Sequence, residues 1–460
     1  MKITPYGGVE GVTGSCFLVE TGASRFLIDC GFFQGEENSR NSKGFPFNVQ
    51  NLDAVFLTHA HLDHSGRLPL LIKNGFRGRI LCTEVTASLT KIMLLDAAKV
   101  MEEDYHSQMK KALRRGEKAK DPLYTEEDVV KTADYFYALP YHKPYSLNGD
   151  ATITLMDAGH ILGSAFVEVV VNEGGKTKKV IFSGDLGNRN KPIVKDPEKP
   201  SDADVVFIET TYGDREHKNF DETYKEFENA IHYAFSKGGN ILIPSFALER
   251  AQELLYILRE MYLQKKLPPC RVFLDSPLAI LATNLFRKHL EYFDDEAQKV
   301  IKAGGDPFYF PYLIFSKSTE DSKAINNIKG RAIIIAGSGM CNGGRILHHL
   351  KHNLWDEKNC VIFIGFQAKG TLGRQIVEGE KTVYIYGEPI KVAAKICTIN
   401  GFSSHADRKI LINWLTSINS LSQVFLIHGE NATKQTFKKE LEQVLTVPIN
   451  TAKEMQEIVI

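Results

Sequence analysis

One short segment gathers side chains that bind metal ions. It reads His59-Ala60-His61-Leu62-Asp63-His64, which places three imidazoles and one carboxylate within six consecutive positions, directly after the apolar run DAVFLT. Zinc binds histidine nitrogen at about 2.0–2.1 Å and carboxylate oxygen at a similar distance. One tetrahedral ion that also holds a water cannot accept four ligands from this turn. The spacing therefore predicts two ions.

Further side chains of the same kind follow apolar runs elsewhere. His160 follows ATITLMDAG, Asp185 ends VIFSGD, and His428 lies in QVFLIHGE. Each has a glycine nearby, where the backbone can approach a site closely. Taken singly, each residue could be a helix cap, a turn aspartate or a buried core histidine. Taken together with the segment 59–64, they favour a common metal site.

In this order along the chain, these residues resemble the motifs of the metallo-β-lactamase fold, whose first motif Asp29 matches at the end of SRFLIDC. Glu209 in VVFIETTYG, His405 in GFSSHAD and His428 in LIHGE are similar to the three added motifs of the β-CASP nucleases. That family includes the endonuclease that processes eukaryotic mRNA 3′ ends and RNA-cleaving relatives in bacteria and archaea. The resemblance covers nearly the whole chain and implies an α/β fold, a metallo-β-lactamase αββα sandwich with an inserted β-CASP α/β domain.

The resemblance also implies a role for each side chain. One Zn²⁺ would be held by His59, His61 and His160, and a second Zn²⁺ by Asp63, His64 and His428, with Asp185 bridging the two. Two such ions can hold a hydroxide and stabilise the charge of an attacked phosphate. Asp63 and Asp185 are therefore predicted as catalytic residues as well as metal ligands. His405 would act as general acid, with Glu209 orienting it. Asp29 would support the ligands structurally.

Glycine-rich loops of the inserted part are candidates for gripping a phosphate backbone, because glycines expose backbone N–H groups. Such loops follow RAIIIA and VIFI, and relatives with similar loops and an arginine like Arg250 bind nucleic acid through them. The predicted substrate-binding residues are Arg250, Ser338, Gly339, Met340, Lys369, Gly370, Thr371 and Arg374. The basic run from Lys110 to Lys120 is typical of a solvated helix face, with an edge of an RNA path as the alternative.

The elements that must position these residues change character along the chain. The first part consists of short strands rich in β-branched residues, such as SCFLVE and AFVEVVV. A helical pattern over about 85–138 interrupts them. From about 210 strands and helices alternate, as in a parallel α/β layer. We therefore predict a metallo-β-lactamase domain over 1–209, an inserted β-CASP domain over 210–390, and the rest of the first domain over 391–460.

Composition narrows the remaining choices. The 460 residues include 56 basic and 56 acidic side chains, which excludes a protein that is basic throughout, although not a local basic groove. Seven scattered cysteines without a CxxC pair favour free thiols. The N-terminus lacks the pattern of a signal peptide, and no apolar run reaches the length of a membrane span, so we expect a cytoplasmic protein that does not bind a membrane.

The sequence therefore predicts a zinc-dependent ribonuclease that hydrolyses single-stranded RNA as an endonuclease, with exonuclease activity and homodimer formation left open. His428 supports RNA over DNA, because DNA-acting β-CASP proteins tend to carry valine at that motif. Two alternatives are a small-molecule metallo-hydrolase of the same superfold, such as a thioesterase or lactonase, and a non-catalytic RNA-binding scaffold. The inserted layer, Glu209 and His405 argue against the first, and the complete ligand set argues against the second.

Overall fold

The computed structural model describes residues 1–365, 367–368 and 370–460, which form two compact units. The first unit comprises Met1–Arg189, Asp196–Glu216 and His405–Ile460, and the second comprises Asn190–Lys195 and His217–Ser404. The main passages between the units thus follow Glu216 and Ser404, whereas the sequence pattern placed the changes after residues 209 and 390.

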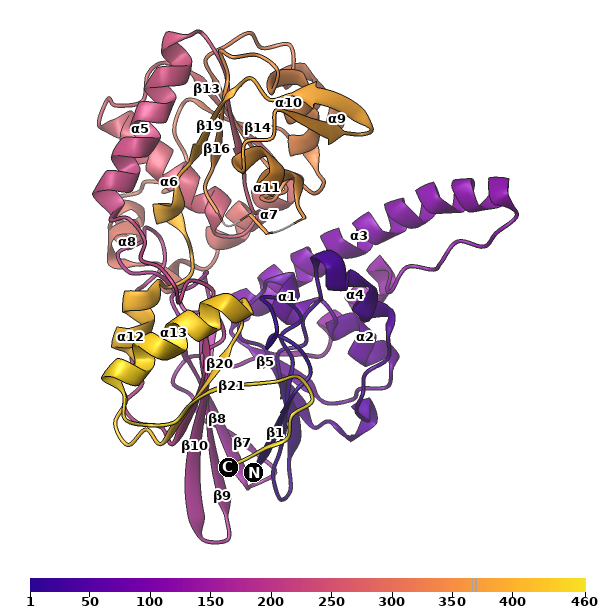
Figure 1. Cartoon of the computed structure of the whole chain (residues 1–460), viewed down its shortest axis with the longest axis vertical. Helices are drawn as coiled ribbons and strands as arrows, with labels where there is room; N and C mark the ends of the chain where they lie inside the picture. The colour runs from indigo at the N-terminus through magenta and orange to yellow at the C-terminus, as the bar shows by residue number, and fades with distance from the viewer. Residues whose placement is uncertain (366, 369) are drawn as a thin grey trace. The chain divides into compact units, whose positions relative to one another are not determined.

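Two seven-stranded sheets form the centre of the first unit. The first has the order β22 (Ile458–Val459), β1 (Lys2–Pro5), β2 (Phe17–Glu20), β3 (Arg25–Ile28), β4 (Ala54–Phe56), β5 (Arg79–Cys82) and β6 (Phe136–Ala138). The second has the order β21 (Ile449–Thr451), β20 (Gln423–Ile427), β11 (Val205–Glu209), β10 (Lys176–Phe182), β9 (Ala165–Glu173), β8 (Ala151–Asp157) and β7 (Tyr145–Leu147). The chain ends lie side by side because β22 pairs with β1 (Figure 1).

The alternation of side chains along the strands builds a core between the sheets. In β8, every second residue is buried and the residues between are partly exposed, as expected of a strand with one face in a core. Phe17 of the first sheet meets Phe182 and Phe207 of the second, and Phe207 stacks on Phe182 and on Phe425 at centroid distances of 4.9 and 4.8 Å. Burial of such rings holds the two sheets together.

Helices cover the outer face of each sheet. They are α1 (Leu62–Ser65), α2 (Leu68–Lys73), α3 (Glu84–Arg115) and α4 (Glu126–Ala133) for the first sheet, and α12 (Arg408–Leu415) and α13 (Asn431–Val444) for the second. Leu71 and Leu94 pack on the first sheet, while Trp414 and Phe437 pack on the second. The predicted αββα sandwich is confirmed.

The helical pattern expected over 85–138 is one long helix and one short helix instead. Gly116, at φ 70°, caps α3 in the left-handed region that glycine adopts without strain. Thr125 begins α4 with a reciprocal capping box to Asp128, and residues 136–138 add strand β6 to the first sheet. The sequence pattern missed this strand because three residues give too little periodicity.

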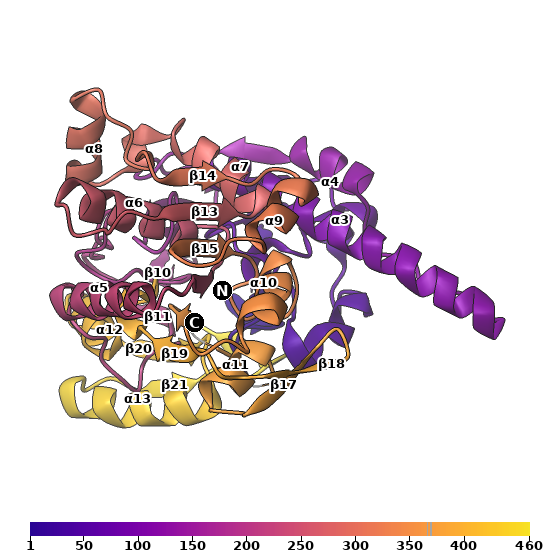
Figure 2. The same ribbon diagram turned by 90° about the horizontal axis from the view of Figure 1, so that it is seen from above.

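The second unit is built on a six-stranded sheet whose strands are all parallel (Figure 2). Its order is β14 (Leu313–Phe315), β13 (Arg271–Asp275), β15 (Ala332–Ala336), β12 (Ile241–Pro244), β16 (Cys360–Phe363) and β19 (Lys395–Thr398). A separate two-stranded sheet pairs β17 (Thr382–Ile385) with β18 (Glu388–Lys391). The helices of this unit are α5 (Phe220–Ser236), α6 (Arg250–Leu263), α7 (Pro277–Phe286), α8 (Asp295–Lys302), α9 (Thr319–Ile325), α10 (Arg345–Asn353) and α11 (Leu372–Val377). The predicted α/β layer is confirmed.

The described residues include no helix that is both long enough and apolar enough to cross a lipid bilayer. The seven cysteines are free thiols, five of them buried.

Candidate metal centre

The topology of the first unit brings the ligand-type residues to one edge. Strands β10, β11 and β20 are neighbours and run parallel, as do β3 and β4 in the other sheet. Carboxyl ends of parallel strands meet at the same edge, where α/β proteins place their functional loops. His59 follows β4, Asp185 follows β10, Glu209 ends β11, and His428 follows β20 directly.

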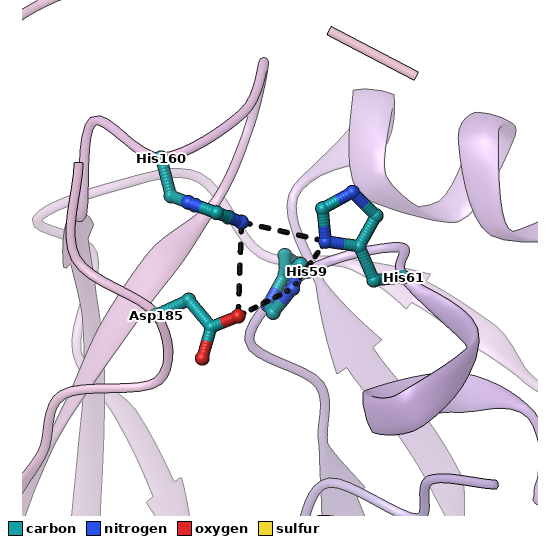
Figure 3. A group of neighbouring side chains, drawn as sticks. All are labelled: His59, His61, His160 and Asp185. Carbon is teal, nitrogen blue, oxygen red and sulfur yellow. Dashed lines mark hydrogen bonds and ion pairs between the residues drawn. The ribbon is translucent and has the colours of Figure 1, made fainter. Parts of the chain in front are cut away.

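A first cluster joins His59, His61, His160 and Asp185 (Figure 3). His61 Nδ1 lies 3.1 Å from His59 Nε2 and 3.4 Å from His160 Nε2. Oδ2 of Asp185 lies 3.5 Å from His59 Nε2 and 3.7 Å from His160 Nε2. Four potential ligand atoms thus converge on one point.

A second cluster joins Asp63, His64 and His428 on the other side of Asp185. His64 Nε2 lies 3.2 Å from His428 Nε2, which is 3.6 Å from Oδ2 of Asp63. The Oδ1 atom of Asp185 lies 3.3 Å from His64 Nε2 and 3.4 Å from His428 Nδ1. Asp185 therefore presents one oxygen to each cluster, which is the arrangement that a bridging ligand requires.

The protonation preferences of the first cluster suit metal ligands. Burial, followed by the neighbouring His64, lowers the pKa of His59 well below its ordinary value. Burial likewise lowers the pKa of His61 to about 4. Both imidazoles are therefore neutral at pH 7, and a neutral imidazole is the form that binds a metal ion.

His64 is oriented from behind by Asp29. Its Nδ1 lies 2.7 Å from Oδ2 of Asp29, so the Nε2 atom is the one directed at Asp185 and His428. Asp29 is itself held by the backbone N–H and the hydroxyl of Thr58, at 2.8 and 2.9 Å. Burial alone would lower the pKa of His64, but Asp185 and Asp29 raise it well above its ordinary value. These two carboxylates therefore favour a proton on His64 Nε2. A metal ion bound at this atom would take the place of that proton.

Asp185 is held in its ionised form between the two clusters. Burial would raise its pKa, but His428, His64 and His405 outweigh burial and hold the pKa well below the ordinary range. Its Oδ1 atom is buried and receives no hydrogen bond from the described residues. A buried carboxylate oxygen is costly unless it is paired, and a cation bound among these histidine nitrogens would stabilise it. The donor set therefore fits divalent metal ions that prefer nitrogen and oxygen ligands, zinc among them.

His405 and Glu209 form a pair beside the metal clusters. His405 Nδ1 lies 3.2 and 3.3 Å from the two oxygens of Glu209, and its ring centroid is 4.5 Å from that of His160. Glu209 is fully buried and accepts a hydrogen bond of 2.7 Å from the backbone N–H of Leu186. Burial lowers the pKa of His405, but Glu209 and Asp185 outweigh it and raise the pKa.

Glu209 also meets the distance requirement of a metal ligand, in a third group with Asp185 and His428. The motif resemblance assigns Glu209 only the orienting role. Its place directly after the apolar run VVFI, comparable to that of Asp185 at the end of VIFSGD, is the sequence signal that could have suggested this second role.

The predicted substrate-binding residues that the structure describes belong to the second unit. The loop after β15 contains Ser338, Gly339 and Met340, and the loop after β16 contains Gly370 and Thr371. The two loops are joined, because Gln367 Nε2 donates to Gly339 O at 3.0 Å and Gly373 N donates to Met340 O at 3.1 Å. Lys369 lies outside the described residues.

The two predicted arginines differ in their surroundings. Arg374 is partly exposed, and its Nε is 2.7 Å from Oε1 of Glu378 one turn along α11. Arg250 is only 5% exposed, and its guanidinium donates to Glu253 and, at 3.1 Å, to Ser404 Oγ. The structure thus places the charge of Arg250 in an internal network.

Three families of known proteins match this chain. Residues 9–216 match the metallo-β-lactamase superfamily, residues 251–376 match the Beta-Casp domain, and residues 389–452 match the Zn-dependent metallo-hydrolase RNA specificity domain.

Individual proteins match over most of the chain. Ribonuclease TTHA0252 of Thermus thermophilus is 42% identical over 430 residues, covering 94% of this chain and 93% of that protein. Transcription termination factor FttA of Methanocaldococcus jannaschii is 31% identical over 471 residues, covering 98% of this chain and 71% of that protein. A crystal structure of a protein of unknown function from Enterococcus faecalis V583 has the same fold, with a TM-score of 0.56 at 12% identity and coverage of 100% and 99%.

Proposed function

Because the chain belongs to the β-CASP family of the metallo-β-lactamase superfamily, we propose that it is a zinc-dependent ribonuclease that hydrolyses phosphodiester bonds of single-stranded RNA. The observation that carries the proposal is the pair of ligand clusters joined by Asp185, with His405 and Glu209 beside them. The family resemblance and a relative named as a ribonuclease, 42% identical, support RNA as the substrate.

In this proposal, each ligand cluster would hold one zinc ion, with ligands from separate parts of the chain. His59, His61 and His160 would hold the first ion, Asp63, His64 and His428 would hold the second, and Asp185 would be shared between them. When bound, the ions supply a nucleophile from water at neutral pH and neutralise the charge on the attacked phosphate.

The protein's own side chains supply the proton. His405 carries a proton that Glu209 and Asp185 stabilise, and it gives this proton to the leaving oxygen. Glu209 fixes the ring through Nδ1, so that Nε2 is the donor atom. Asp29 keeps the Nε2 atom of His64 available as a ligand.

The joined loops after β15 and β16 are proposed to hold RNA phosphates. The loop segments with Ser338, Gly339, Met340, Gly370 and Thr371, together with the side chains of Lys369 and Arg374, would position the strand without reading its bases. Arg250 supports this part of the unit from inside, through Glu253 and Ser404, because its charge is buried.

The test is cleavage of end-labelled single-stranded RNA by the metal-loaded protein, with and without chelator. We expect shortened products that disappear with chelator and return with added zinc, and the product lengths separate internal cleavage from cleavage at an end. A thioester and a lactone serve as control substrates. Turnover of either one without RNA cleavage would favour a small-molecule hydrolase, and RNA binding without turnover would favour a scaffold.

A further inference from the structure

The C-terminal part of α3 extends beyond the other elements of the first unit (Figures 1 and 2). Up to Ala98 the helix packs through buried side chains that recur at helical spacing, among them Val85, Leu89 and Leu94. Beyond Ala98 only Ala112 is buried. The returning chain is tied to the helix by a hydrogen bond from Glu126 N to Oε1 of Glu102, at 3.2 Å. We call residues 103–120, beyond this tie, the arm.

The arm is stabilised by local interactions, since it has little packing. Gly116 caps the helix, and its N–H donates to the carbonyl oxygens of Ala112 and Leu113. Arg114 and Arg115 occupy the last turn, where cations interact favourably with the helix dipole. Because burial stabilises this part of the helix so little, its cap and the charges in its last turn must contribute to its stability.

The tip of the arm is strongly basic, although the chain as a whole has no net charge. Its exposed cations are Lys110, Lys111, Arg114, Arg115, Lys118 and Lys120, against a single carboxylate, Glu117, between residues 110 and 120. Glu117 pairs with Arg115 at 3.2 Å, and in the described part of the chain the other five cations have no carboxylate within 4.0 Å. Such a surface attracts a polyanion.

Three of these cations form a row. Lys110, Lys111 and Arg114 share one face of the helix with His106 and Ser107, as their spacing of three and four residues requires. Glu103 lies on the same face about two turns towards the base of the arm, with Asp104 next to it in the chain, and the third acidic residue, Glu117, lies at the tip beside Arg115. Positive charge is thus concentrated at the tip, in line along the helix axis.

From this arrangement we propose that the arm binds the phosphate backbone of RNA at a distance from the metal centre. The proposal rests on the proposed function, which supplies RNA as the ligand. A protein partner would require an apolar centre of the contact surface. Within residues 103–120, all of them described, Leu113 is the only large apolar side chain that is strongly exposed, at 69%. Exposed Lys and Arg side chains suit phosphates without selecting a base sequence.

The start of α3 links the arm to the metal centre. The hydroxyls of Thr83 and Thr86 both donate to Gly163 O at 2.8 Å, and Gly163 follows His160 by three residues. From there the 32 residues of α3 extend about 48 Å at 1.5 Å per residue. An RNA strand must therefore exceed about 14 nucleotides, at about 3.4 Å each, to reach from the centre to the tip.

The test compares a long RNA of about 40 nucleotides with a short RNA of about 6, which cannot span that distance. The arm variant combines Lys110→Gln, Lys111→Gln, Arg114→Gln and Lys118→Gln, and glutamine is nearly as good a helix former as lysine and arginine. The control variant removes four exposed charges elsewhere in the first unit: Lys43→Gln, Lys176→Gln, Lys199→Gln and Lys439→Gln. Circular dichroism checks the fold, and the double variant Lys110→Gln/Lys111→Gln serves if the quadruple variant loses helix.

We expect the arm variant to weaken binding of the long RNA about tenfold more than binding of the short RNA at low salt, measured by fluorescence anisotropy. Its salt dependence for the long RNA should flatten by about 0.7 in log–log slope for each phosphate that the arm no longer neutralises. The control variant should change both RNAs alike. An arm variant that behaves as the control does would overturn the proposal and leave an acidic protein as the next partner to test. Cleavage is read separately, so a parent that binds RNA without cutting it contradicts the proposed activity and not the arm.

Discussion

Replacing His405 by alanine should separate proton transfer from metal binding. The ring belongs to none of the ligand groups found among the described residues, and its Nδ1 faces Glu209. The side chain keeps 22% of its surface exposed, so it can reach a substrate atom. Because Glu209 and Asp185 raise the pKa of His405 against the effect of burial, the protonated donor is favoured near neutral pH.

The usual contribution of a general acid sets the size of the expected effect. Loss of a general acid typically costs about 10²–10⁴-fold in rate, or about 3–5 kcal/mol of activation free energy. The fold should survive, because Glu209 keeps the hydrogen bonds from Leu186 N at 2.7 Å and Thr211 N at 3.3 Å. The loss of one buried partner costs about 1–3 kcal/mol of the roughly 5–15 kcal/mol that stabilises a domain.

The assay combines elemental analysis with two substrates. We expect His405→Ala to retain the parent's metal content and to cleave RNA about 10²–10⁴-fold more slowly. A nitrophenolate leaving group departs without accepting a proton. The variant should therefore slow hydrolysis of a nitrophenyl phosphodiester far less than it slows cleavage of RNA. His232→Ala is the matched control, because His232 is 54% exposed on α5 and pairs with Glu228 at 3.9 Å.

Two results would refute this reasoning. A His405→Ala protein that loses metal would make His405 a ligand. Equal losses on RNA and on the activated diester would show that His405 does not protonate the leaving group.

The remaining predictions concern other parts of the same reasoning. Elemental analysis should find two zinc ions per chain, and His59→Ala or Asp185→Ala should lose metal and activity together, whereas one ion in the metal-replete parent would exclude a two-metal site. Glu209→Gln removes a charge that raises the pKa of the general acid, so activity should begin to fall at a lower pH as pH rises through that pKa; a pH–rate profile tests this, and loss of zinc would instead make Glu209 a ligand. Arg250→Ala leaves Glu253 buried without its main cation, so urea denaturation should show a loss of about 3 kcal/mol, and an unchanged midpoint would contradict the internal network.

The sequence by itself determined the features that local patterns encode. The density of ligands from His59 to His64 follows from residue type and spacing alone, and the alternation in β8 and the strand–helix repeats follow from hydrophobic periodicity. These features, with motifs matched in order along the chain, were sufficient for the family and for the fold, both of which are confirmed. The roles of the individual site residues stay predictions.

Only the tertiary structure decided how distant residues meet. The sequence does not show that Asp185 directs one oxygen to each cluster, or that Glu209 lies within reach of a metal, because both depend on which strands are neighbours and in what register. It also predicted Arg250 as a substrate-binding residue and could not show that the fold buries its guanidinium against Glu253 and Ser404. Burial and long-range pairing are properties of the assembled chain, and a local pattern of residues cannot specify them.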